Sequence, residues 1–263
     1  MIKKRDYLLI GLVALMIGLF NFAPATLISQ YIADKTTNIV LLTNAQGTIW
    51  EGNAELAISG EQSPIQALNH ALSIGKIDWH VKASRLILGE LNIAINCNNS
   101  EFATLILTPT YLSITKVNLD LPTHIVLTLV PSLNAAQLGG QLHVSTSNFS
   151  VAHLNHSNLK PNFTGQIQLD WQQASSPLSP INPLGNYQAN ISGVKEQIII
   201  KVSTLNGPLM IEGDGALNLA SGLQFNGIAS AESSQKQALA PLLHVLGNEI
   251  IADSGRYKIN YNH

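Results

Sequence analysis

Charged side chains are scarce in this 263-residue sequence, because Asp, Glu, Lys and Arg make up only 11% of it. Soluble domains usually carry roughly 25%. The 14 basic and 16 acidic residues leave a formal net charge of −2. Nucleic-acid-binding proteins normally show a basic excess, so the composition argues against DNA or RNA as a partner. Hydrophobic residues reach 46%, which is too much for an intrinsically disordered chain.

Cysteine occurs once, at Cys97. A single thiol excludes an intramolecular disulfide and a cysteine-based zinc site. Such a thiol is compatible with the cytosol and, when buried, with an oxidising compartment. The cellular compartment must therefore be inferred from the N-terminus.

The sequence also lacks the common catalytic motifs, among them the nucleophile elbow, the P-loop and the zinc-protease helix. His153 and His156, with His143 nearby, have a metal-like spacing, but no carboxylate or thiol adjoins them. We interpret them as part of a solvated loop. Asp78 and Asp170 each precede a tryptophan, and each carboxylate is expected to face away from the indole. The sequence predicts no enzyme, no catalytic residues, no cofactor and no metal.

The N-terminus combines a basic cluster with a long apolar stretch. Lys3, Lys4 and Arg5 precede residues 7–25, which are almost entirely apolar and approach the ~20 residues that span a bilayer. Positive residues favour the cytoplasmic side. We therefore predict a cytoplasmic tail (1–6), a transmembrane helix (7–25), a membrane-proximal segment (26–38) and a domain outside the cytoplasm (39–263).

A cleaved signal peptide is the competing interpretation of this segment. Ala23-Pro24-Ala25 is similar to a signal-peptidase site. An apolar pattern that continues the helix past Pro24 favours retention instead, and its members are Leu27, Ile28, Tyr31 and Ile32. Both interpretations deliver the main domain across the membrane.

From about Val40 onward, apolar and polar residues alternate with a period of two. Leu91, Ile93 and Ile95 alternate with Asn92, Ala94 and Asn96, for example. This period is typical of strands with one buried and one wet face, and turn residues recur between them. The predicted fold is mainly β, with one large antiparallel sheet that is curved or sandwich-like.

Two or three short helices are predicted beside this sheet, and two of them can be placed as its cover. The first begins at Ser63-Pro64 and ends at Gly75. The second ends at Gly247 and is kinked, or begun, by Pro241. Their apolar stripes are Ile65, Leu68 and Leu72 in the first, and Leu239, Leu242, Leu243 and Leu246 in the second.

The sequence also shows weak internal similarity. Trp171 follows Trp79 by 92 residues, and Gly139 follows Gly47 by 92 residues. A Leu-Gly pair follows each Asp-Trp pair. We therefore predict a duplicated unit, with repeats at about 47–138 and 139–230.

The segment Gly47-Thr48-Ile49-Trp50-Glu51-Gly52 resembles the GTLWxG signature of the general (type II) secretion pathway protein N family. Further blocks resemble the same family in the same order, and the resemblance extends over the chain from the apolar segment onward. The resemblance and the strand-end glycines mark these residues as structural: Gly47, Thr48, Trp50, Gly52, Trp79, Gly89, Gly140, Trp171, Gly185, Tyr187, Gly207, Pro208, Gly213, Gly227 and Gly247.

The resemblance implies a single-pass protein of the bacterial inner membrane with a periplasmic β-rich domain. It implies an accessory component of the type II machine that exports folded proteins, with no catalytic residues. The expected partners are other secretion components, of the inner and possibly the outer membrane, and lipid contacted through the anchor. We expect a sheet edge or an apolar face to act as the docking surface.

The residues leave one alternative role open. Charge-poor strands rich in Leu and Ile can form an apolar β groove that binds lipid or another hydrophobic ligand. Co-purified lipid would favour this role over protein docking.

Overall fold

The computed structural model describes residues 18, 20–60, 63–98, 100–123, 136–153, 160–219, 221–251 and 254–262. Lys3, Lys4 and Arg5 lie outside these ranges, as does most of the predicted transmembrane segment. Within the described ranges, no helix has both the length and the apolar character needed to cross a membrane. The transmembrane helix therefore stays a prediction.

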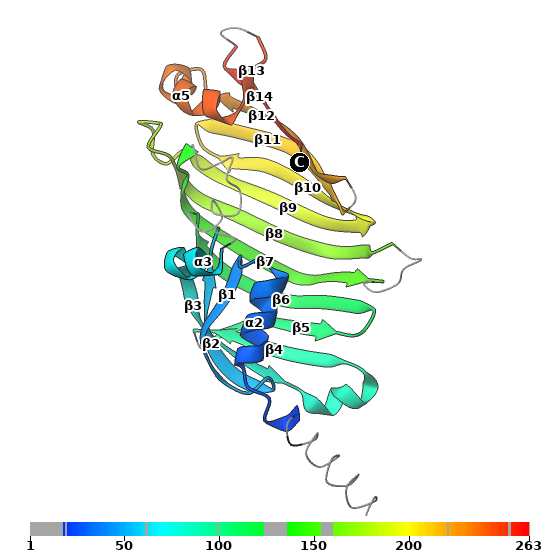
Figure 1. Cartoon of the computed structure of the whole chain (residues 1–263). Helices are drawn as coiled ribbons and strands as arrows, with labels where there is room; N and C mark the ends of the chain where they lie inside the picture. Colours follow the sequence, from blue (N-terminus) through cyan, green and yellow to red (C-terminus); the bar gives the residue numbers. More distant parts are fainter. Residues whose placement is uncertain are drawn as a thin grey trace, which may run out of the picture. The chain divides into compact units, whose positions relative to one another are not determined.

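The chain divides into two compact units, residues 1–101 (unit 1) and 102–263 (unit 2). Within each unit, antiparallel strands pair with their neighbours and form an open sheet (Figure 1). The prediction of a mainly β fold with a large antiparallel sheet is therefore confirmed. The sheet is open, which differs from the sandwich-like alternative. Three α-helices and one 3-10 helix occur in the described part of the chain.

Unit 1 contains four strands in the order β1-β2-β3-β4. Their bounds are β1 Val40–Gly47, β2 Glu51–Ile58, β3 Leu72–Val81 and β4 Leu91–Cys97, with a 3-10 helix at Ala83–Leu88. Helix α2 (Thr26–Lys35) packs on β1 and contributes Ile28 and Ile32 to a core that contains the buried Trp79. A helix past Pro24 is thus present, but the predicted apolar stripe is only half right, because Ile28 and Ile32 pack on the core whereas Leu27 and Tyr31 are exposed. The helix is also a new element and not a continuation, because Pro24 lies in a β-bridge.

The first predicted cover helix differs from expectation. Helix α3 spans Pro64–His70 and ends five residues before Gly75, which lies in β3 at a register shift with φ +155°. The expected stripe is wrong, because Ile65 and Leu68 are 74% and 59% exposed while the small Ala67 is buried. A helix of only seven residues makes two turns, so a single residue supplies its contact with the sheet.

Unit 2 is a longer sheet whose strands follow the order β5-β6-β7-β8-β9-β10-β11-β12-β14-β13. β5 begins at the boundary between the units. The bounds are β5 Ser100–Leu107, β6 Tyr111–Pro122, β7 Gly139–Ala152, β8 Asn162–Ser175, β9 Gly185–Lys195, β10 Gln197–Asn206, β11 Leu209–Asn218, β12 Gly222–Ala231, β13 Asn248–Glu249 and β14 Arg256–Asn262.

Helix α5 (Lys236–Leu246) packs against β12, β13 and β14. It buries Leu239, Leu242 and Leu243, and it contains Pro241 in its interior. The second predicted helix is therefore confirmed. Its leucines join a core cluster with Leu184, Tyr187 and Tyr257.

The strand register of unit 2 separates its sheet into an apolar face and a polar face. One row across six neighbouring strands is uncharged: Ile167, Ile191, Ile200, Gly215, Phe225 and Tyr261. The row next to it points to the other side and is polar: Gln168, Asn190, Lys201, Asp214, Asn226 and Asn260. This separation follows from the alternation in the sequence, because side chains in a strand alternate between faces.

Candidate functional site

The motif segment 47–52 forms the tight turn between β1 and β2 of unit 1. Gly47 has φ +88°, and a Cβ there would lie 2.6 Å from the Glu51 carbonyl oxygen. The Thr48 amide donates to that carbonyl at 2.9 Å, while the Thr48 hydroxyl accepts from the amides of Trp50 and Glu51, each at 3.2 Å. The glycine and threonine of the motif are therefore required by the geometry of this turn.

The turn holds the last residues of the predicted transmembrane segment. The Ala25 amide donates to the Gly47 carbonyl at 3.1 Å, and the Ile49 amide donates to the Ala23 carbonyl at 2.9 Å. Pro24 lies opposite Thr48 in an isolated bridge. We call residues 20–25 the strap. Its last three residues, 23–25, pair with the turn as a short strand does, whereas Phe20 and Asn21 are helical.

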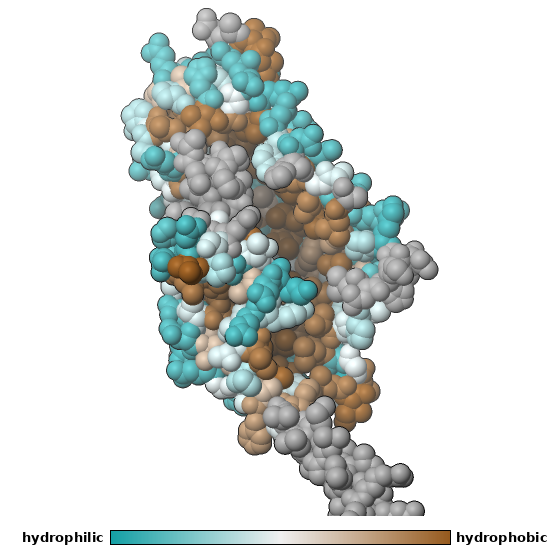
Figure 2. Space-filling model, in the orientation of Figure 1, coloured by the Kyte–Doolittle hydropathy of each residue, from teal (hydrophilic) through white to brown (hydrophobic). Residues whose placement is uncertain are grey.

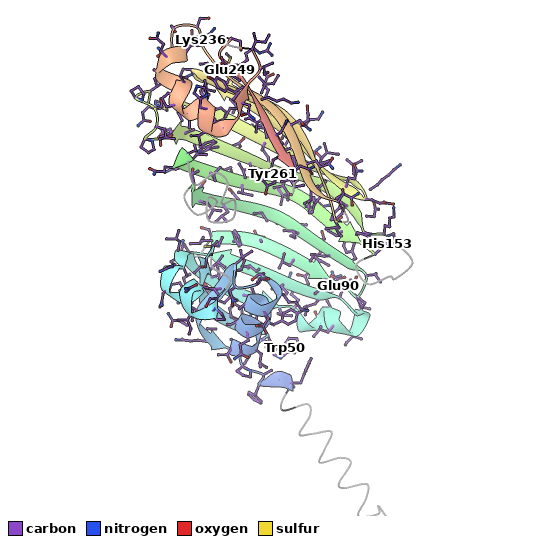
Figure 3. The ribbon with its side chains drawn as sticks, turned by 45° about the horizontal axis from the view of Figure 1, so that its top comes forward. Trp50, Glu90, His153, Lys236, Glu249 and Tyr261 are labelled. Atoms are coloured by element: carbon purple, nitrogen blue, oxygen red, sulfur yellow. The ribbon has the colours of Figure 1, made fainter. Side chains whose placement is uncertain are left out.

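Trp50 extends this contact to the beginning of the strap (Figure 3). Its indole Nε1 donates to the Phe20 carbonyl at 2.8 Å, and the two rings meet edge to face with centroids 4.6 Å apart. Phe20 and Phe22 are 56% and 79% exposed, whereas Ala25 is buried in the core of unit 1. The strap therefore has an aromatic, exposed start and a buried end.

Trp79 supports the turn from the neighbouring strand. It is buried, and its indole Nε1 donates to the Thr48 carbonyl at 3.2 Å. Gly52 lies opposite Trp79 in the register, and a Cβ at Gly52 would lie 2.6 Å from the indole ring. A glycine at position 52 is thus what allows the tryptophan to lie flat against the strand.

The same arrangement occurs within unit 2. The Trp171 indole donates to the Gly139 carbonyl at 3.1 Å, and a Cβ at Gly140 would lie 2.9 Å from its Nε1. Trp171 also packs on Tyr187, whose buried hydroxyl donates to the Leu209 carbonyl at 2.8 Å. A tryptophan above a glycine therefore recurs in the two units, while the predicted duplication stays a prediction.

The other motif positions serve local packing. A Cβ at Gly185, Gly207, Gly213 or Gly227 would lie within 3.0 Å of backbone or a packed ring, and one at Gly247 would lie within 3.0 Å of backbone. Pro208 precedes β11. Gly89 differs, because it has φ +72° at the end of the 3-10 helix and open space around it.

The described residues hold no group of three metal-ligating side chains. His143 Nδ1 and Asp120 Oδ1 form a hydrogen bond of 2.7 Å, while His156 lies outside the described ranges. Asp78 and Asp170 lie in different units, and Asp170 accepts hydrogen bonds from Gln168 and Gln188. His143 and Asp170 are therefore used in cross-strand contacts, with Asp120 and Gln188 respectively.

Burial and neighbouring groups perturb a few titratable side chains. Burial raises the pKa of Tyr187. Burial also raises the pKa of the Cys97 thiol, with a smaller contribution from the Asp78 carboxylate. Hydrogen bonds from Ser113 and Ser150 lower the pKa of Tyr111. These three groups lie on different strands and form no common cleft, so the perturbations reflect packing and local bonds.

Comparison with known families decides the assignment. The family described as "Type II secretion system (T2SS), protein N" matches residues 38–260. The chain belongs to the protein N family of type II secretion. No match was found among curated proteins, and none among solved structures. The family resemblance of the sequence is thereby confirmed, and the matched region includes the turn and both tryptophan–glycine pairs.

Membership in the protein N family makes this chain an envelope-associated component of type II secretion. The family is an accessory part of the machinery and not a known enzyme. Sequence reasoning found the family motif but missed its contact with the strap. Ala23 and Ala25 are similar to a cleavage signal only in the competing interpretation, and no local pattern shows that their backbone pairs with a turn more than 20 residues away.

Proposed function

We propose that this protein is a membrane-anchored periplasmic accessory component of the type II secretion system and acts by docking other secretion components. The observation that carries the proposal is the pairing of the strap with the Gly47–Gly52 turn. This pairing connects the apolar N-terminal segment directly to the β-rich domain.

The strap supports retention of the anchor over cleavage after Ala25. Cleavage there would remove Ala25, a core residue that is 1% exposed, together with its hydrogen bond to Gly47. It would also remove Phe20 and its contacts with Trp50. The pair Phe20 and Trp50, with the exposed Phe22 nearby in the sequence, is the kind of aromatic group that gathers at a membrane–water interface.

The docking role is supported by an open strand edge in unit 2. β13 pairs only with Lys258 and Tyr257 of β14. On that side of β14, no other strand of unit 2 lies beside Asn260 within the described part of the chain. An uncovered edge of this kind can accept an extended segment of another protein as an additional strand.

A photoreactive amino acid at Asn260 tests the docking role in intact cells that carry the secretion system. Asn190 is the matched control: it belongs to the same polar row and is also exposed, but it lies in an interior strand, about 19 Å away at the usual strand spacing. We expect adducts with secretion components at Asn260 and several-fold fewer at Asn190. Equal or absent protein adducts at both positions would contradict docking at this edge.

A further inference from the structure

The apolar face of unit 2 extends beyond the part that the core covers. The core cluster is formed by side chains of α5, of the segment before β9 and of one end of the strands. Ile191, Ile200 and Phe225 are half-buried and are not among the described side chains of that cluster. Figure 2 shows hydrophobic side chains gathered at the surface over the middle strands of unit 2. We call this region the open apolar face.

The surface of the open apolar face is flat around Phe225. Phe225 lies against β11, where a Cβ at Gly213 would be 2.5 Å from the phenyl ring and a Cβ at Gly215 would be 2.9 Å from it. These glycines leave room for the ring to lie along the sheet. Interior strands of a sheet use their backbone groups in the ladder. The face therefore offers a bound molecule hydrocarbon contact and few hydrogen bonds.

Most charged side chains of these strands lie on the other side of the sheet. In strands β8 to β12 and β14, five of the charged side chains lie in polar-face rows: Asp170, Lys201, Glu212, Asp214 and Lys258. Arg256, opposite Ser230, is also in such a row. At the end of the apolar face, Lys195 lies opposite Phe163 at the β9–β10 turn, where Lys160 pairs with Glu196 at 2.6 Å. These three side chains give the turn a net positive charge beside an uncharged surface.

We propose that the open apolar face binds the acyl chains of a phospholipid, with its phosphate at the Lys195 turn. The uncharged apolar rows complement hydrocarbon, and the positive turn complements the phosphate. Protein interfaces are enriched in aromatic, Met and Arg side chains, and Leu and Val are under-represented at their hot spots. Ile191, Ile200 and Val202 are aliphatic instead. The proposal rests on the proposed anchoring, which keeps the chain beside a bilayer.

A photoreactive amino acid at Ile200 of the full-length protein tests the proposal in membranes of cells grown with radiolabelled phosphate. Lys201 is the matched control, because it is the next residue on the same strand and faces the polar side. After irradiation and denaturing purification, we expect several-fold more phospholipase-sensitive label at Ile200 than at Lys201. Ile198, on the same face of β10, is a second photoreactive position that keeps the test valid if the change at Ile200 disturbs folding.

Equal label at Ile200 and Lys201 would overturn lipid binding, as would adducts with a protein or with a second copy of this chain. Reversal of the charge in Lys195→Glu should reduce the label at Ile200 several-fold, and an unchanged label would overturn the phosphate contact. These results are independent of crosslinking at Asn260. If lipid adducts are absent at Ile200 but protein adducts remain at Asn260, the docking proposal stands and lipid binding fails. If lipid adducts form at Ile200 but protein adducts are absent at Asn260, docking alone fails.

Discussion

The Trp50 indole donates a hydrogen bond of 2.8 Å to the carbonyl of Phe20, and the two rings meet at a centroid distance of 4.6 Å. One of these residues belongs to the family motif, and the other lies in the predicted membrane helix. Their contact gives the motif a physical role, which is to fix the chain where it leaves the apolar segment.

Substitution Trp50→Phe should loosen the strap while it keeps an aromatic ring. Loss of the indole donor removes a hydrogen bond worth about 1 kcal/mol. Hydrogen exchange at the Ala25 and Ile49 amides should then become roughly fivefold faster, as expected for that free energy. Exchange at Leu209, in unit 2, serves as the internal control. Unchanged exchange at Ala25 and Ile49 would show that Trp50 does not hold the strap.

Substitution Gly52→Ala should destabilise unit 1 strongly. The new Cβ would lie 2.5 Å from the Gln46 carbonyl oxygen and 2.6 Å from the Trp79 ring. We expect a loss of about 3 kcal/mol, the upper end of the usual cost of over-packing, measured from hydrogen exchange in β2.

Gly89→Ala is the matched control for Gly52→Ala. Position 89 has open space but a left-handed backbone with φ +72°, so its cost should be about 1–2 kcal/mol. Equal losses for the two variants would contradict a steric role for Gly52.

Unit 2 should lose stability at alkaline pH through Tyr187. Burial raises the pKa of this phenol in the folded state above the ~10 expected when it is unfolded. The stabilising effect is therefore complete below about pH 10 and is lost as the pH rises toward the folded pKa.

The Tyr187→Phe variant separates this effect from other alkaline titrations. It should be less stable at neutral pH by about 1–3 kcal/mol, because the buried Leu209 carbonyl loses its donor. Its free energy of unfolding in urea should then fall less than that of the natural protein between pH 8 and 11. Parallel pH curves for the two proteins would refute the assignment.

Cys97 should react slowly with alkylating reagents, because burial and the Asp78 carboxylate raise the pKa of its thiol. Removal of that charge in Asp78→Asn should lower this pKa and accelerate alkylation by iodoacetamide at pH 8. Asp120→Asn, which removes an exposed carboxylate in unit 2, should leave the rate unchanged. An equal acceleration in both variants would point to global loosening.

Local patterns in the sequence predicted most of the strands and the second helix. The alternation of Ile198, Ile200 and Val202 places these residues on one face of β10, as the register confirms. The leucines at 239, 242 and 243 are buried in α5. The period of two in the strand and the helical spacing of the leucines each extend over enough residues to identify the buried face from the sequence.

Features that depend on contacts between distant residues could not be predicted in this way. Gly75 appeared to be a helix stop, but its backbone conformation belongs to a register shift in β3 beside Asn98. Ile65 is apolar yet exposed, because Ala67 makes the contact of α3 with the sheet. The pairing of Ala23 and Ala25 with the motif turn has no local signature, since it joins segments more than 20 residues apart.

Intact-mass measurement of the protein extracted from membranes tests the central claim most directly. The anchored account predicts a mass that includes residues 7–25, because the strap at 20–25 completes the core of unit 1. A mature protein that begins at Thr26 and is released from the membrane would contradict it.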